Sequence, residues 1–526
     1  MSGVKSSRRM LQSSASSPDK RACGDLRSDL NLQKGFIMFQ KIGTVLKLEG
    51  IMLLILGASM SVPLLIALIN SETSAARAFA IVIFLCIFTG FILRRFFNSF
   101  RYKFKGRDGF FIVAVSWFTA SAVGAAPFMI SGEIPGFFDA FFESASGFST
   151  TGSSILTDVE ALPRSILFWR SFTHWLGGMG IIVFITALIP AFGINGQIVA
   201  SAETTGPTKN KILAKFSDNS KEVYRVYIIM TGAETLLLML GGLPIYDALI
   251  HTFGTVGTGG LSIYNASIGH YNNVYVEIVV AVFMFLAAIN FNLFYMVKKR
   301  GVLQIFKDEE TKFYTTVTIS AGLLIAVYNF ISDSFSQFGE KLLNSFFQVI
   351  SILTTTGYAT DDYDVWPTFS KMVLFTLFFI GGCSSSTAGG IKGVRVLIGL
   401  KIIRRSISLK VHPSRITPIT LNESELSSGT AIKISNFIFT YLFVFFAGTV
   451  LLSLNGFDLM TNVSAAASCL GNIGPGFNLV GPTMNFSMFS WFSKFVCSIL
   501  MIIGRLELYT VLVLFSKYYW NPNRTR

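Results

Sequence analysis

The string Ser149-Thr150-Thr151-Gly152 recurs in related form three more times along the chain. The other copies are Val256-Gly257-Thr258-Gly259, Thr354-Thr355-Thr356-Gly357 and Gly471-Asn472-Ile473-Gly474. Each copy lies between a short apolar stretch that is too brief to cross a bilayer and a longer one that can cross it. A single Thr/Gly string carries little information, but four in the same context indicate a fourfold pseudo-repeat.

The composition indicates the medium in which the repeat folds. Of the 526 residues, 52% are hydrophobic and only 14% are charged, whereas soluble globular domains carry about 25% charged residues. Long apolar runs begin near Gly50, Ala78, Phe110, Ile166, Val223, Tyr275, Tyr314, Lys371, Asn436 and Met488. Since a spanning helix needs about 20 apolar residues, the sequence predicts an all-α integral membrane protein with about ten transmembrane helices.

The net charge of +14 follows a membrane pattern and does not indicate a nucleic-acid partner. Lys and Arg gather on every second side of the predicted spans, whereas the segments between them are acidic. The basic segments are 1–48, 94–107, 209–225, 298–312, 392–415 and 517–526. By the positive-inside rule, these segments and both termini are cytoplasmic.

The order of the runs predicts an initial helix pair and four copies of one pore repeat around a central pore. Each repeat contains a long helix, a short re-entrant pore helix with its filter strand, and a second long helix. The expected pore helices cover 137–148, 246–255, 342–353 and 459–470. The predicted units are a basic cytosolic tail at 1–48, the helix pair at 49–107, and repeats at 108–222, 223–312, 313–429 and 430–526, the last with the C-terminal tail.

The four strings suit a monovalent cation, because extended Thr/Gly backbone presents carbonyl oxygens that replace the water shell of the ion. Each pore helix also directs the partially negative end of its dipole toward the axis. The alternative is four Gly-rich turns that only pack helices. The candidate filter residues are Thr150, Thr151, Gly152, Val256, Gly257, Thr258, Gly259, Thr355, Thr356, Gly357, Asn472, Ile473 and Gly474.

No enzymatic site is indicated by the sequence. The five Cys residues are odd in number, and neither they nor the four scattered His residues show disulfide or metal-ligand spacing. The titratable residues inside the predicted spans are isolated from one another. We therefore expect a transport protein whose own chain carries no cofactor.

Four longer motifs, together with the filters, resemble the superfamily of potassium transporters that includes the Trk, Ktr and plant HKT proteins. The motifs are residues 144–152 (SASGFSTTG), 175–181 (WLGGMGI), 381–392 (GGCSSSTAGGIK) and 504–508 (GRLEL). The resemblance covers about residues 49–515. Because of the leading helix pair, it is closest to the membrane subunit of bacterial Trk systems.

The resemblance implies potassium uptake across the bacterial cytoplasmic (inner) membrane, with potassium as the substrate. It also implies a homodimer in membrane lipid, with one pore in each subunit, and a cytosolic Rossmann-type (TrkA-like) ring that alone would bind NAD or ATP. In this superfamily four filter glycines accompany potassium preference, and Ser at the first place accompanies sodium preference in many plant members. The corresponding residues here would be Gly152, Gly259, Gly357 and Gly474. Symport coupled to protons or sodium, and a sodium-permeable pore, remain as alternatives.

Residues 381–390 interrupt the second helix of the third repeat with Gly and Ser, which are poor helix formers. The resemblance implies that this segment is an intramembrane gating loop beneath the filter. A flexible kink is the alternative. The candidate gate residues are Gly381, Gly382, Ser384, Ser385, Ser386, Thr387, Gly389 and Gly390, together with Arg505.

Arg505 lies inside the last predicted helix, where an unneutralised charge is costly. The resemblance implies that it projects into the pore below the filter, as an electrostatic barrier to cations. The alternative is that Arg505 forms a structural ion pair with a residue of another helix. Glu507, two residues further on, faces roughly the other way and is not an obvious partner within the same helix. After the third filter, three acids either concentrate cations at the pore mouth or belong to a solvated loop: Asp361, Asp362 and Asp364.

Overall fold

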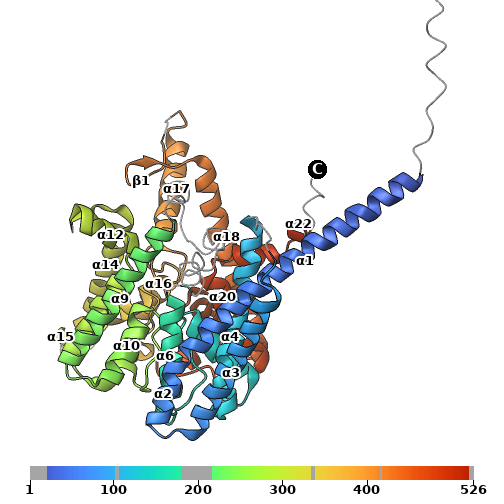
Figure 1. Cartoon of the computed structure of the whole chain (residues 1–526). Coiled ribbons are helices and arrows are strands. Elements are labelled where there is room, and N and C mark those ends of the chain that lie inside the picture. Colours follow the sequence, from blue (N-terminus) through green and yellow to red (C-terminus); the bar gives the residue numbers. More distant parts are fainter. Residues whose placement is uncertain are drawn as a thin grey trace, which may run out of the picture.

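The computed structural model of the chain describes residues 20–100, 106–178, 180, 216–301, 303–332, 338–414 and 417–520. These residues are mostly helical (Figure 1), which confirms the predicted all-α class. Within the described ranges, the strands are limited to one antiparallel pair of two residues each, β1 (Thr420–Leu421) and β2 (Ser424–Glu425).

Two long helical segments form the N-terminal part. α1 (Lys20–Ser59) continues after Met60 as α2 (Ser61–Ile69), and α3 (Thr73–Phe96) packs along α1. The first half of α1 projects away from the other helices (Figure 1). Its start lies well before residue 49, so the predicted end of the tail does not coincide with the start of a helix. The part that is apolar enough to span a membrane is Met38–Ile69.

Four groups of helices follow in chain order. The first contains α4 (Gly106–Ser131), α5 (Phe137–Phe148) and α6 (Arg164–Gly178). The second contains α9 (Phe216–Leu240), α10 (Ile245–Val256), α11 (Val274–Ala287) and α12 (Phe291–Arg300). The third contains α14 (Glu309–Ser332), α15 (Phe338–Leu353), α16 (Thr368–Leu377) and α17 (Gly393–Val411). The fourth contains α18 (Ser428–Leu452), α19 (Leu459–Gly471) and α20 (Trp491–Arg505).

Short helical segments connect or follow these groups. They are η3 (Ser267–Tyr271), α13 (Leu303–Lys307), η4 (Tyr363–Val365), η5 (Ser453–Asn455), η6 (Asn478–Val480), α21 (Tyr509–Leu512), η7 (Val513–Phe515) and α22 (Lys517–Trp520).

Six helices in the described ranges are long and apolar enough to cross a membrane. The count rises to eight if two bent pairs are each taken as one span: α11 with α12, bent by 93°, and α20 with residues 509–515, bent by 109°. Of the other two predicted spans, α16 is separated from α17 by the loop 378–392, and the predicted end of the helix that includes α6, near residue 192, lies outside the described residues. The total of ten crossings therefore stays a prediction.

The four short helices α5, α10, α15 and α19 lie where the sequence predicts the pore helices. They contain 12, 12, 16 and 13 residues, too few to cross a bilayer. Local signals fix their starts: Pro244 precedes α10, and the Asp458 carboxylate caps α19 by accepting from Thr461 N (3.0 Å). Their C-terminal halves are buried, so they end in the protein interior.

The second long helix of one group packs against the pore helix of the next. α6 lies against α10, α11 against α15, and α20 against α5. Between the third and fourth groups the contact is aromatic: Phe378, directly after α16, stacks on Phe477 with ring centroids 5.6 Å apart. The four groups therefore close into a ring, as a fourfold pseudo-repeat requires.

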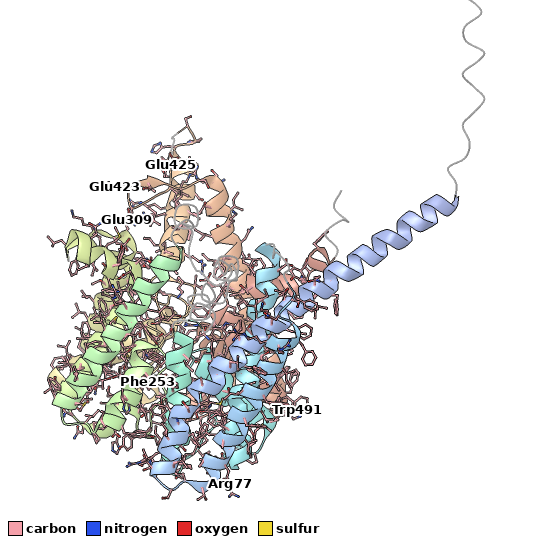
Figure 2. The ribbon with its side chains drawn as sticks, in the orientation of Figure 1. Arg77, Phe253, Glu309, Glu423, Glu425 and Trp491 are labelled. Atoms are coloured by element: carbon pink, nitrogen blue, oxygen red, sulfur yellow. The ribbon has the colours of Figure 1, made fainter. Side chains whose placement is uncertain are left out.

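The β1–β2 hairpin joins α17 to α18 at one end of the molecule (Figure 1). Its turn residues, Asn422 and Glu423, have φ of +49° and +63°, which a two-residue hairpin turn requires. Asn422 Nδ2 donates to Asp308 Oδ1 (2.8 Å) and ties the hairpin to the start of α14. Figure 2 shows Glu309 and Glu423 at this end and Arg77 at the opposite end.

Candidate functional site

The chain leaves each pore helix through the same backbone turn. One residue at the start of each exit strand has a left-handed conformation: Thr150 (φ +56°), Thr258 (+54°), Thr355 (+57°) and Asn472 (+54°). Two residues later φ is positive again: Gly152 (+85°), Gly260 (+72°), Gly357 (+84°) and Gly474 (+107°). The residue between has a negative φ. Residues with φ of alternating sign do not form a regular β-strand, in which every φ is negative.

The second strand differs in register from the one that the sequence suggests. The amide of Gly259 donates to the carbonyl five residues earlier (2.7 Å), as the amide of Thr151 does (2.9 Å). Gly259 is therefore the counterpart of Thr151, and Gly260 is the counterpart of Gly152. The predicted equivalence of Gly259 with Gly152 is wrong by one residue. Val256, the last residue of α10, precedes the strand.

The four strands meet in a closed ring. A Cβ atom added to any of the four strand glycines would crowd the carbonyl oxygen of the next strand, at the residue before its own glycine. The pairs are Gly152 with Gly259 O, Gly260 with Thr356 O, Gly357 with Ile473 O, and Gly474 with Thr151 O. This order runs once around the ring and returns to the first strand. A side chain at any of these places has to displace the neighbouring backbone.

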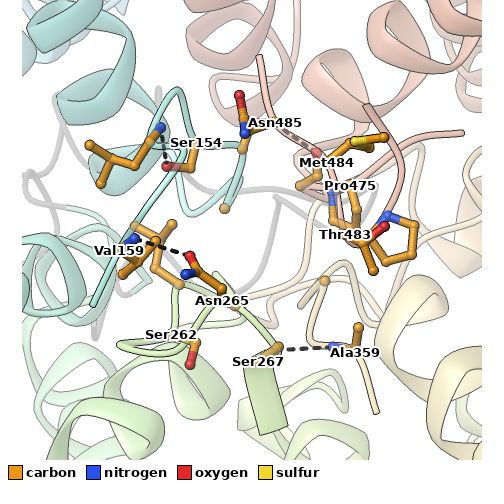
Figure 3. Close-up of a pocket in the computed structure, with 18 of the residues that line it drawn as sticks. Ser154, Val159, Ser262, Asn265, Ser267, Ala359, Pro475, Thr483, Met484 and Asn485 are labelled. Carbon is orange, nitrogen blue, oxygen red and sulfur yellow. Dashed lines mark hydrogen bonds between the residues drawn. The ribbon is translucent and has the colours of Figure 1, made fainter. Parts of the chain in front are cut away.

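A cavity of about 140 Å³ opens on the side of the ring that the chain reaches after the glycines. All four strand glycines line it, with segments of all four groups around them (Figure 3). Hydrogen bonds join these segments: Val159 N donates to Asn265 Oδ1 (3.0 Å), and Ala359 N donates to Ser267 Oγ (3.2 Å). We call this cavity the vestibule. Its wall is therefore cross-linked between neighbouring repeats.

One carboxylate near the vestibule, that of Asp247, lies in the first turn of α10 and binds Tyr264, which lines the cavity. Asp247 Oδ2 accepts from the Tyr264 hydroxyl (3.2 Å) and from the Tyr271 hydroxyl (2.9 Å). Burial and the adjacent Asp247 carboxylate raise the pKa of Tyr264. This hydroxyl therefore remains a proton donor at physiological pH.

The three acids that follow the third strand bind neighbouring loop groups. Asp361 Oδ2 accepts from the indole of Trp366 (2.9 Å), Asp362 Oδ2 accepts from Thr483 Oγ1 (3.4 Å), and Asp364 Oδ2 accepts from Asn478 N (2.7 Å). Two of these bonds cross from the third repeat to the fourth. The acids therefore organise the loops at the mouth, and their role in concentrating cations stays a prediction.

A buried ion pair of the first repeat lies behind the ring and also binds the second repeat. Arg170 Nε donates to Glu143 Oε1 (2.7 Å), and the two side chains are 2% and 0% exposed. Arg170 also donates to Ser262 O (3.2 Å), and the Glu143 carboxylate accepts from Ile155 N (3.1 Å). The pair thus fixes α5 and α6 to the segments that leave the first and second strands. It was not predicted, although two opposite charges in apolar stretches of one repeat are a signal for it.

On the opposite side of the ring from the vestibule, the loop between α16 and α17 folds back on itself. Gly381 (φ +75°) and Gly390 (+73°) lie so close that a Cβ on Gly390 would come within 2.8 Å of Gly381 Cα. Gly393 N donates to Gly382 O (2.9 Å), which closes the neck of the loop. The predicted gate residues 381–390 therefore form one compact unit.

A buried carboxylate from α14 fixes both ends of the loop. Glu310, which is 4% exposed, accepts from Ser384 N (2.6 Å), Ser384 Oγ (2.7 Å) and Val394 N (3.0 Å). Lys392 donates to Ala388 O within the loop. Neither Glu310 nor Lys392 was predicted as a site residue, because their partners become neighbours only in the folded loop.

The loop also contacts the second repeat and the starts of two strands. The bend between α11 and α12 holds it through two backbone bonds, and two consecutive loop amides bind residues at the pore-helix ends. These bonds are Cys383 N to Ala288 O (2.8 Å), Phe291 N to Ser385 O (3.1 Å), Gly389 N to Thr355 Oγ1 (2.6 Å) and Gly390 N to Gly471 O (2.9 Å). The loop therefore touches the second, third and fourth repeats.

Arg505, the last residue of α20, donates to carbonyl oxygens of two other repeats. Its Nη2 donates to Gly177 O (2.7 Å) and Gly178 O (2.6 Å), and its Nη1 donates to Thr387 O (2.5 Å). The first two carbonyls belong to the C-terminal turn of α6, where the helix dipole favours a cation. The structure thus brings Arg505 together with the predicted gate loop. Glu507 instead pairs with Arg395 (2.7 Å).

Similarity to known proteins extends over most of the chain. Residues 75–523 match the TrkH family, described as cation transport proteins. The Trk system potassium uptake protein TrkH of Salmonella typhimurium is 32% identical over 480 residues, which cover 90% of this chain and 99% of that protein. The Trk system potassium uptake protein TrkG of Escherichia coli is 33% identical over 476 residues, covering 90% and 97%.

A solved structure has the same fold. The crystal structure of the potassium transporter TrkH from Vibrio parahaemolyticus matches with a TM-score of 0.82 and 29% sequence identity, covering 91% of this chain and 99% of that one. The family match, the relatives and the fold agree over nearly the same residues. The chain therefore belongs to the TrkH family of cation transport proteins, which are membrane transporters and not enzymes.

Proposed function

We propose that this chain takes up potassium across the bacterial cytoplasmic membrane through a selective, channel-like pore. The closed ring of four strands is the observation that carries the proposal. Relatives that are named for potassium uptake indicate the ion. The ring supplies a physical mechanism, because converging carbonyl oxygens from four strands replace the hydration shell of a monovalent cation.

The pore helices add to the preference for a cation. All four end next to the ring, and the C-terminal end of a helix carries a partial negative charge. In the fourth strand Asn472 replaces the Thr of the other strands, and its Nδ2 donates to Thr151 Oγ1 (2.9 Å) and Met501 O (2.9 Å). Asn472 therefore ties the fourth strand to the first. In this proposal Ile473 contributes its carbonyl group and no side-chain oxygen.

The loop 381–390 and Arg505 would form the gate on the cytoplasmic side of this filter. The loop binds Thr355 and Gly471 at the starts of two strands, which supports a position in the path of an ion that leaves the ring. Arg505 adds a positive charge at the same level, held by the Gly177 and Thr387 carbonyls. Opening would require the loop and the arginine to move together.

Assembly and regulation belong to the same proposal. We expect a homodimer with one pore in each subunit, both termini in the cytoplasm, and a cytosolic Rossmann-type ring that binds NAD or ATP. In this proposal nucleotide control comes from that ring.

Flux measurements on the purified chain in liposomes test the proposal. We expect potassium to move down its own gradient when no proton or sodium gradient is imposed. Potassium movement that strictly requires a second ion would contradict the channel mechanism and favour symport.

Gly152→Ser should lower the preference for potassium over sodium. A side chain at this place crowds Gly259 O, so the carbonyl ring widens or distorts. We expect the potassium to sodium permeability ratio in liposomes to fall about tenfold. An unchanged ratio in a correctly folded variant would count against the filter.

Arg505→Ala should increase basal potassium flux and leave selectivity unchanged. At about 6 Å and an effective dielectric constant of about 20, two unit charges repel by roughly 3 kcal/mol. Removing the guanidinium also frees the Thr387 carbonyl of the loop. We expect a rise of about tenfold or more in liposome flux.

Arg505→Lys provides the matched control, since it keeps the charge but not the fork of donors. If charge is the barrier, the lysine variant should stay near wild-type flux. A loss of thermal stability in Arg505→Ala without any gain in flux would instead show that Arg505 serves only to pack the helices.

A further inference from the structure

Two consecutive amides of the loop point at the strands of the ring. Gly389 N donates to Thr355 Oγ1 across 2.6 Å, and both residues are buried. Gly390 N donates to Gly471 O (2.9 Å) at the end of α19. The acceptor of the first bond is a side chain, so a substitution can remove it. The acceptor of the second bond is a backbone carbonyl.

The three residues equivalent to Thr355 in the other strands use their side chains differently. The Thr258 hydroxyl donates to Gly257 O within its own strand (2.7 Å), and Asn472 binds the first strand. The Thr150 hydroxyl is buried and has no hydrogen-bond partner among the described residues. Among these four residues, the loop binds the side chain of Thr355.

We propose that Thr355 is a positioning residue for the gate, whose hydroxyl holds the loop in its obstructing position by accepting from Gly389 N. The inference rests on the proposed gating role of the loop. A buried amide needs a partner, and in the packed loop Thr355 Oγ1 is that partner. Without the hydroxyl, the Gly389 amide has to find another partner. The loop therefore more often adopts a position in which this amide binds water. The third strand therefore takes part in closing the pore as well as in forming its filter.

Thr355→Val removes the acceptor and nearly preserves the shape of the side chain. In liposomes containing the purified full-length chain without any partner protein, we expect its basal potassium flux to rise about tenfold. Thr355→Ser keeps the hydroxyl and should retain wild-type flux.

Thr318→Val is the matched control outside the filter. Thr318 lies in α14, is 3% exposed, and its hydroxyl donates to Tyr314 O of the same helix (2.9 Å). Both substitutions remove a buried threonine hydroxyl, but only Thr355→Val removes a bond to the loop. A similar rise in both variants would overturn the proposal, as would a folded Thr355→Val with wild-type flux.

Deletion of residues 384–388 separates this inference from the gate itself. If the loop is the gate, the deletion alone raises basal flux, and Thr355→Val then adds nothing further. A deletion without effect would refute the gate, whereas an active deletion combined with a silent Thr355→Val would refute only the role of Thr355. Gel filtration and thermal unfolding report folding, and Thr355→Ala replaces the valine variant if valine does not fold.

Discussion

Gly260→Ala should abolish most cation flux, although this glycine lies one place beyond the string that the sequence suggests. Its φ of +72° is unfavourable for alanine, and a Cβ there would overlap with Thr356 O and crowd Gly357. The second and third strands would have to separate, which breaks the ring. We expect potassium flux in liposomes to fall about a hundredfold.

Gly456→Ala distinguishes loss of the ring from backbone strain. Gly456 has a similar φ of +75°, but nothing lies within 4 Å of its added Cβ. Alanine there should cost about 1–2 kcal/mol of stability and leave flux and selectivity unchanged. If Gly260→Ala conducts as well as Gly456→Ala, the proposed register of the second strand is wrong.

Glu143→Gln should destabilise the protein by about 3–5 kcal/mol, because it leaves the Arg170 guanidinium buried and without its counter-charge. The substitution hardly changes volume, so the expected cost is electrostatic. The Arg170 side chain is only 2% exposed and cannot turn into water without unpacking α6. Thermal unfolding in detergent measures this loss, and selectivity should weaken with it because Arg170 also holds Ser262 O.

Glu222→Gln gives the comparison for an exposed pair. Glu222 accepts from Arg225 (2.8 Å), whose side chain is 60% exposed, so its removal should cost less than about 0.5 kcal/mol. Replacing both Glu143 and Arg170 with uncharged residues should restore part of the stability. Equal stability of Glu143→Gln and the wild type would show that the buried pair does not hold the ring.

The pore helices were predictable because their signals are local. Short apolar runs with Thr/Gly strings after them place α5 at residues 137–148, as observed, and α10 and α19 within one residue at each end. α15 begins at Phe338, four residues before its predicted start at 342. The interrupted helix was predictable for the same reason, because Gly and Ser do not sustain a helix.

Register and long-range partners were not predictable in this way. Gly259-Gly260 offers a glycine in two successive places, and the positive φ of Gly260 together with its close approach to Thr356 O identifies the second as the counterpart of Gly152. Arg505 binds Gly177 O and Thr387 O, which are backbone groups far away in the sequence. No side chain therefore marks these residues as its partners. The start of α1 at Lys20 was missed because the polar stretch before residue 49 lacks apolar periodicity.

The potassium to sodium permeability ratio of the purified wild-type chain tests the central claim most directly. It is obtained from the reversal potential with potassium on one side of a bilayer and sodium on the other, with no proton gradient. A carbonyl ring built by Gly152, Gly260, Gly357 and Gly474 should give a large reversal potential, with the sign expected when potassium is much more permeable than sodium. A reversal potential near zero, or no current without a second driving ion, would contradict a selective potassium pore.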